Sequence, residues 1–93
     1  MHSAQTLQET VTSLSGDEVV SRAKAFFSNR PTLYAAFIDR EGPSFVSFRG
    51  QGTEELVIGV APADGGGTRV TGSTYLFDMQ VSRFFATLPP VGA

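Results

Sequence analysis

Residues 44–61 read SFVSFRGQGTEELVIGVA and contain two stretches with the pattern of β-strands. Both Ser44–Gly50 and Thr53–Ala61 are short segments bounded by turn residues, which is typical of strands. The link between them, Gln51-Gly52, is short, and a link of this length joins antiparallel neighbours. The segment therefore predicts an antiparallel hairpin.

Two more strands are predicted beside this hairpin, one before it and one after it. Leu33–Arg40 precedes the hairpin and Thr68–Leu76 follows it, and both are rich in residues that favour strands. The connections, Glu41–Pro43 and Pro62–Gly67, are short and consist largely of turn residues. Four strands in an antiparallel meander are therefore expected.

One helix is predicted before the four strands in the sequence and one after them. Ser15-Gly16-Asp17-Glu18 has the S-x-x-E form of a capping box, which predicts a helix from about Asp17 to Ser28. A final helix is expected from Phe77 or Asp78 to Leu88. Its apolar side chains recur at helical spacing, at Phe77, Val81, Phe84 and Leu88.

The segment before the first helix completes the expected fold. Residues 7–14, LQETVTSL, are rich in Thr and Val and favour a strand, with a short helix as the alternative. The element order is then β-α-β-β-β-β-α. We expect one α+β domain over residues 1–93, with a curved antiparallel sheet of four or five strands and two helices packed on one face.

A strand register follows from placing the apolar side chains together. The pairs on which it rests are Arg40 with Ser44, Phe48 with Glu54, and Val60 with Thr68. One face is then almost entirely apolar and must be covered by the helices; it carries Tyr34, Ala36, Ile38, Val46, Phe48, Leu56, Ile58, Val60 and Val70. The other face is largely polar but also carries Phe37, Phe45 and Val57, with Phe45 directly opposite Val57.

These three apolar residues predict an interface, because both helices are needed on the other side of the sheet. We expect a homo-oligomer, most simply a dimer, that associates through Phe37, Phe45 and Val57. The alternative is that the first fifteen residues of the same chain fold across this face.

The order of elements resembles the START-like helix-grip superfamily (SRPBCC), which includes polyketide cyclases and lipid-transfer and hormone-binding proteins. The resemblance is carried by the entry from strand to helix at 13–20, the late hairpin at 65–71 and the closing helix at 77–88. It implies a reduced helix grip, because members are usually longer, and a ligand cavity between the sheet and the C-terminal helix. The inward residues that could fill this cavity are Phe26, Phe27, Phe48, Phe84 and Phe85. The superfamily has no shared catalytic motif, so the resemblance assigns no catalytic residue.

Composition excludes several kinds of chemistry. The chain has no cysteine and one histidine, His2, which excludes disulfides, a Cys nucleophile, a His-based triad and a multi-His metal site. The net charge is −2 and no two of the seven basic residues are adjacent, so no nucleic-acid partner is expected. No apolar run approaches ~18 residues and no signal peptide is visible at the start, so we expect no membrane partner and a cytoplasmic location. No metal or other cofactor is expected.

Three local features could carry chemistry. Gly65–Gly67 leads into a strand and not into a helix, which favours a flexible hairpin loop over a phosphate-binding loop. Glu54 and Glu55 are neighbours in a strand and point to opposite faces, so they cannot act as a carboxyl pair. A polar cluster that could bind a ligand carboxylate or hydroxyl consists of Tyr75, Asp78 and Arg49, although Asp78 could simply cap the last helix.

The sequence favours two functions about equally. The first is binding of a small apolar molecule, and the ligand-binding residues it predicts are Tyr34, Phe48, Tyr75, Asp78 and Phe84. The second is a non-catalytic, self-associating interaction module without a ligand. An enzyme of the cyclase or dehydratase kind, using tyrosine and carboxylates, is the least favoured hypothesis. The first two are distinguished by whether Phe26, Phe48 and Phe84 fill the space between sheet and helices.

Overall fold

A computed structural model of the chain describes residues 6–28, 37–49, 55–74 and 78–92. The elements in these ranges are β1 (Thr6–Thr12), α1 (Gly16–Ser28), β2 (Phe37–Gly42), β3 (Phe45–Arg49), β4 (Glu55–Pro62), β5 (Thr68–Thr74) and α2 (Asp78–Ala86). The expected order β-α-β-β-β-β-α is confirmed, and residues 7–14 supply a strand and not a helix.

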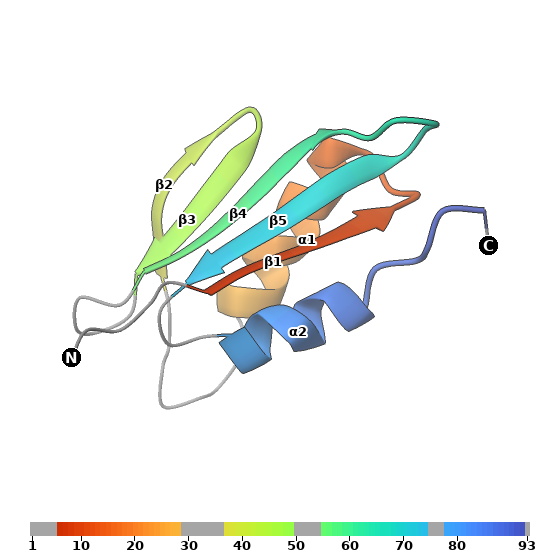
Figure 1. Ribbon diagram of the computed structural model, residues 1–93. Helices are drawn as coiled ribbons and strands as arrows, with labels where there is room; N and C mark the ends of the chain where they lie inside the picture. The colour runs from red at the N-terminus through yellow and green to blue at the C-terminus, as the bar shows by residue number, and fades with distance from the viewer. Residues whose placement is uncertain (1–5, 29–36, 50–54, 75–77, 93) are drawn as a thin grey trace.

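The described strands form one antiparallel sheet in the order β1-β5-β4-β3-β2 (Figure 1). Helix α1 packs on β2, β3 and β4, and α2 packs on β1 and β5. Side chains from both helices and from one face of the sheet form a single buried cluster, so the helices lie on the same side. The predicted two-layer α+β fold is confirmed. Neither helix is long and apolar enough to cross a membrane.

In β3, β4 and β5 the side chains lie on the predicted faces, but the pairing between these strands differs by two residues. Phe48 lies opposite Leu56, not Glu54, and Val60 lies opposite Val70, not Thr68. A shift of two residues leaves the side chains of these three strands on their expected faces, since side chains alternate with a period of two. The observed register places apolar residues opposite each other under the helices, whereas the expected one placed Glu54 there.

The hairpin between β2 and β3 is also tighter than expected. Arg40 lies opposite Ser47, not Ser44, and Gly42 pairs with Phe45. The register shifts between Ile38 and Arg40, so one residue is inserted into β2 at that point. The predicted pairing was wrong because alternation of polarity does not reveal an inserted residue.

The start of α1 has the predicted capping box. The backbone N–H of Glu18 donates to the Ser15 hydroxyl at 3.1 Å, and the Ser15 N–H donates to the Glu18 carboxylate at 3.0 Å. Each bond satisfies a backbone group that the helix leaves without a partner. The hydrogen bond from the Ser15 backbone, together with that from its side chain, lowers the pKa of Glu18 below its ordinary value.

The end of α2 comes two residues earlier than predicted. The helix ends at Ala86, and the Thr87 and Leu88 N–H groups donate to the carbonyls of Phe84 and Phe85, three residues back. This tighter turn precedes Pro89, whose ring disfavours a helical conformation at the residue before it. Leu88 nevertheless remains buried, as its place on the apolar stripe predicts.

Candidate interaction surface

The space between the sheet and the helices is occupied by aromatic rings from both layers. The ring centroid of Phe27 lies 5.2 Å from that of Phe48 and 5.4 Å from that of Phe84. Phe26 packs against Phe27 at 5.0 Å and against Phe84 at 5.4 Å. Phe48 and Phe84 are fully buried. These four rings therefore fill the region where the helix-grip resemblance places a ligand.

The structure places the predicted ligand-binding residues in different environments. Phe48 and Phe84 belong to this core. Asp78 is the exposed first residue of α2, and its backbone carbonyl accepts a hydrogen bond from the Gln8 amide at 2.8 Å. Tyr34 and Tyr75 lie outside the described residues. The structure therefore does not bring the five together, and ligand binding by them stays a prediction.

Arg49, the third member of the predicted polar cluster, takes part in a different contact. Its guanidinium lies 4.0 Å from the carboxylate of Glu55, which is its neighbour across β3 and β4. Among the described residues, no group of three or more His, Cys, Asp or Glu side chains could hold a metal ion. Gly65–Gly67 forms the loop between β4 and β5, with positive φ at all three residues, and opens no helix.

One pocket of about 230 Å³ lies at the end of the sheet, beside the start of α1. It is lined by Gly16, Pro43, Ser44, Val60, Ala61, Pro62 and Thr68. Its volume is below the ~300–1,000 Å³ of typical small-molecule sites. The Thr68 hydroxyl already donates to the Leu14 carbonyl, and the Ser44 carbonyl already accepts the Val60 N–H. The pocket therefore offers few free polar groups to orient a ligand.

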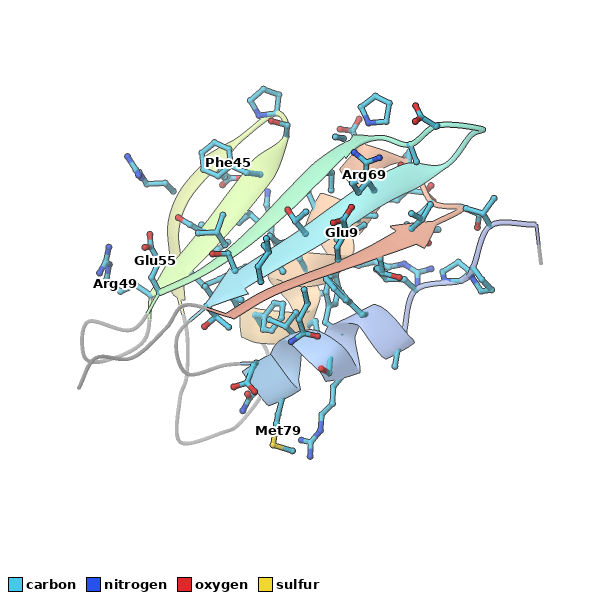
Figure 2. All side chains as sticks on the ribbon, in the orientation of Figure 1. Glu9, Phe45, Arg49, Glu55, Arg69 and Met79 are labelled. Atoms are coloured by element: carbon cyan, nitrogen blue, oxygen red, sulfur yellow. The ribbon has the colours of Figure 1, made fainter. Side chains whose placement is uncertain are left out.

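The side of the sheet away from the helices, which we call the outer face, is covered by no described helix or strand. Its described side chains come from all five strands: Leu7, Glu9 and Val11 of β1, Arg69, Thr71 and Ser73 of β5, Glu55, Val57, Gly59 and Ala61 of β4, Phe45, Ser47 and Arg49 of β3, and Arg40 of β2. Figure 2 shows Glu9 and Arg69 side by side over β1 and β5, and Phe45 over β3. The outer face is the largest open surface that the described elements leave.

The centre of the outer face is apolar and bordered by small side chains. Val57 lies between Ser47 and Ser73, and both Val57 and Phe45 are partly exposed. Phe45 pairs with Gly59, so the prediction that it lies directly opposite Val57 is wrong. The two are diagonal neighbours instead, because the register is shifted by two residues. The side chain of Phe37 lies outside the described residues.

Charged side chains lie at both ends of the outer face, in oppositely charged pairs. Arg69 Nε is 2.9 Å from the carboxylate of Glu9 at one end, and Arg49 faces Glu55 at the other. Exposed pairs of this kind contribute only about 0–1 kcal/mol each to stability. Each of these two described pairs joins one cation to one anion.

The most exposed large apolar side chains of the outer face are on β1, which the sequence reasoning did not identify. Leu7 is 68% exposed and Val11 is 42% exposed. Their alternation with Gln8 and Thr10 showed that they share a face, but only the pairing of β1 with β5 places that face at the sheet's edge. The alternative in which the first fifteen residues cross the outer face is wrong for residues 6–15, which extend the sheet and lead into α1.

No protein-family model matches this chain, and no curated protein matches it either.

Proposed function

We propose that this protein is a non-catalytic interaction module that associates with a second copy of itself through the outer face. The observation that carries the proposal is the contrast between the two sides of the sheet. One side is filled by the rings of Phe27, Phe48 and Phe84, while no described element covers the other. Because the domain's own side chains fill the space between sheet and helices, binding is expected on its outer surface.

The size of the outer face is sufficient for a specific contact. Five strands about 4.8 Å apart, each with roughly seven residues of about 3.3 Å, cover roughly 24 by 23 Å, or about 550 Å² per copy. Two such faces in contact bury about 1,100 Å², just above the ~1,000 Å² expected of a biological interface. The contact is therefore expected to be of modest strength.

The chemistry of the face fits a second copy. Val57 and Phe45 are already partly buried, so their further burial contributes only a fraction of the ~1.5–3 kcal/mol of a fully exposed side chain, set against the cost of association. Gly59, Ala61 and Ser73 are small and allow another sheet to approach closely. Each of the two described charge pairs has one cation and one anion, so each offers an opposite charge to a charged side chain of a second copy.

The resemblance to a reduced helix grip supplies the competing function, which is binding of a small apolar molecule. Native mass spectrometry of protein isolated from its own host separates the two. We expect a mass that is a multiple of the chain mass, with no additional small molecule. A monomer that carries a bound apolar molecule would contradict the proposal and support the ligand-binding function.

A further inference from the structure

The two edges of the sheet differ in how they are protected against pairing with another chain. The β2 edge has an inserted residue between Ile38 and Arg40 and carries the charged side chains of Arg40 and Glu41, the latter paired with Lys24. Inserted residues and charges are the usual devices that block an edge strand. The described β1 edge has no inserted residue, and its one charged side chain, Glu9, lies between the exposed apolar side chains of Leu7 and Val11.

The backbone of β1 shows which groups face this edge. A Cβ on Gly67, the residue just before β5, would lie 2.6 Å from the carbonyl oxygen of Thr12, so this carbonyl points toward β5. The N–H of Ser13 points the other way and donates to the Pro89 carbonyl at 3.1 Å. Residues along an antiparallel strand alternate between pairing inward and pointing outward. Leu7, Glu9 and Val11 therefore direct their N–H and C=O groups out of the sheet.

We propose that the β1 edge pairs with the β1 edge of a second copy, antiparallel about a two-fold axis at Glu9, to form one continuous sheet. In this register Leu7 lies opposite Val11 of the partner subunit, and Val11 lies opposite Leu7 of the partner subunit. Each of the three outward residues exchanges both of its backbone hydrogen bonds with its opposite number.

A second copy fits this edge because the strand is complementary to itself. Leu7 and Val11 are the exposed large apolar side chains of the strand. In the two-fold arrangement Leu7 of each copy packs against Val11 of the other copy, so this contact forms twice. The pairing ends naturally at Ser13, whose N–H is already bonded to Pro89. An isologous contact of this kind closes on itself and leaves no free edge at β1.

The two-fold pairing of β1 strands has one unfavourable feature, which can be used to test it. Glu9 lies opposite Glu9 of the partner subunit, and like charges directly opposite each other destabilise a strand pair. Each carboxylate brings its own counterion, because Arg69 lies 2.9 Å away on β5. The variant Glu9→Gln removes the repulsion and is expected to tighten the edge contact.

The edge contact goes beyond the outer-face association and does not depend on it. Pairing at β1 extends the sheet sideways, so the outer faces of the two copies become continuous and stay open. Edge pairing and face-to-face packing can therefore occur together, as two interfaces of one symmetric assembly.

A comparison of Glu9→Pro with Glu9→Ala tests the edge contact. Both variants lose the carboxylate, but only proline removes the outward N–H, and an edge strand tolerates proline where the N–H faces solvent. Sedimentation equilibrium is measured for both in a Val57→Glu background, which removes the outer-face contact. We expect Glu9→Ala to dimerise and Glu9→Pro to have a dissociation constant at least tenfold higher.

The outcomes separate the two interfaces. Equal dissociation constants for the alanine and proline variants would overturn edge pairing, and so would a monomeric Val57→Glu parent. In either case a wild-type protein that still associates would leave the outer-face proposal standing. Conversely, a wild type and a Val57→Glu variant that both dimerise equally, and are both disrupted by Glu9→Pro, would support the edge contact and contradict the outer-face contact.

Amide hydrogen exchange supplies a second readout that needs no variant. We expect the N–H groups of Leu7, Glu9 and Val11 to exchange slowly in concentrated protein and rapidly after dilution. Thr10, which pairs inward with Val70, should be protected under both conditions. Rapid exchange of the three outward groups in a sample that is demonstrably dimeric would overturn the edge contact.

Discussion

Two glycines set how closely separate parts of the chain approach each other. A Cβ on Gly72 would lie 2.5 Å from Val81 on α2, so glycine in β5 lets the helix pack directly on the strand. Gly67 has a φ of +84°, and its Cβ would lie 2.6 Å from the Thr12 carbonyl oxygen and 2.7 Å from the Val91 side chain. Gly65 has a similar φ of +81° but faces open space.

The pair Gly67→Ala and Gly65→Ala separates backbone strain from close contact. A side chain in the left-handed region costs about 1–2 kcal/mol, and this cost applies to both variants. Gly67→Ala has the additional clash with a backbone oxygen that belongs to the sheet. We expect it to lower the free energy of unfolding by about 3 kcal/mol or more, as measured by urea denaturation. Equal losses for the two variants would show that Gly67 does not pack against β1.

Ser15 has a local role that one substitution isolates. Replacing it with alanine removes the acceptor for the Glu18 N–H, and the loss of an N-cap costs about 0.5–2 kcal/mol of stability. The measurement is the urea midpoint of Ser15→Ala against wild type. Ser21→Ala, at an exposed position in α1 six residues further along the chain, is the control and is expected to leave the midpoint nearly unchanged.

Glu18 links the same cap to pH. Its pKa is lower in the folded chain than the ordinary value of 4.5, because the Ser15 backbone N–H donates to the ionised carboxylate. The carboxylate therefore stabilises the fold above pH 4.5, and this contribution is lost as the pH falls through the lowered pKa. Wild type should lose more stability than Glu18→Gln between pH 6 and 3 in urea titrations. Parallel pH profiles would contradict the role of the carboxylate.

At the scale of elements, α2 is held by a few buried side chains. Val81 and Phe84 are fully buried, and Met79 on the same helix is 62% exposed. We expect Phe84→Asp to unfold the domain, because an unpaired buried carboxylate costs several kcal/mol out of the ~5–10 that a domain of this size has. Met79→Asp should leave a cooperative thermal melt near that of wild type. A similar melt for Phe84→Asp would show that α2 does not dock on the sheet.

The elements themselves were predictable from the sequence, while their exact pairing was not. A capping box and an apolar stripe are contiguous signals, so α1 and α2 could be located from sequence alone. Alternation in β3 and β4 fixes which side chains share a face, but it is unchanged when a strand slides by two residues. The choice between Glu54 and Leu56 as the partner of Phe48 depends on tertiary packing.

The candidate surface was predictable to the same extent. Phe45 and Val57 were placed on the outer face by alternation alone, and the structure confirms that face. Leu7 and Val11 were missed because their exposure depends on β1 pairing with β5 at the sheet's edge, which no local pattern reveals. Phe48 and Phe84 were predicted to bind a ligand, and the structure places them in the core. The sequence could not separate these roles, since an inward aromatic residue is compatible with both.

At the scale of the whole molecule, one layer of helices covers one side of a five-stranded sheet in the described part of the chain (Figure 1). A sheet with one covered face has three other boundaries, which are its open face and its two edges. The β2 edge carries charges and an inserted residue, whereas the centre of the outer face is apolar and the β1 edge has one charged side chain, Glu9, between two exposed apolar ones. The association proposed for this protein uses the two boundaries that have less of this protection.

Sedimentation equilibrium of wild type, Val57→Glu and Met79→Glu tests the central claim most directly. Both variants replace an apolar side chain with a carboxylate, but Val57 lies at the centre of the outer face and Met79 on α2, away from the sheet (Figure 2). We predict that wild type and Met79→Glu associate equally at micromolar concentrations, and that Val57→Glu has a lower average mass at every concentration. A strictly monomeric wild type, or a Val57→Glu variant that associates as well as wild type, would contradict the account.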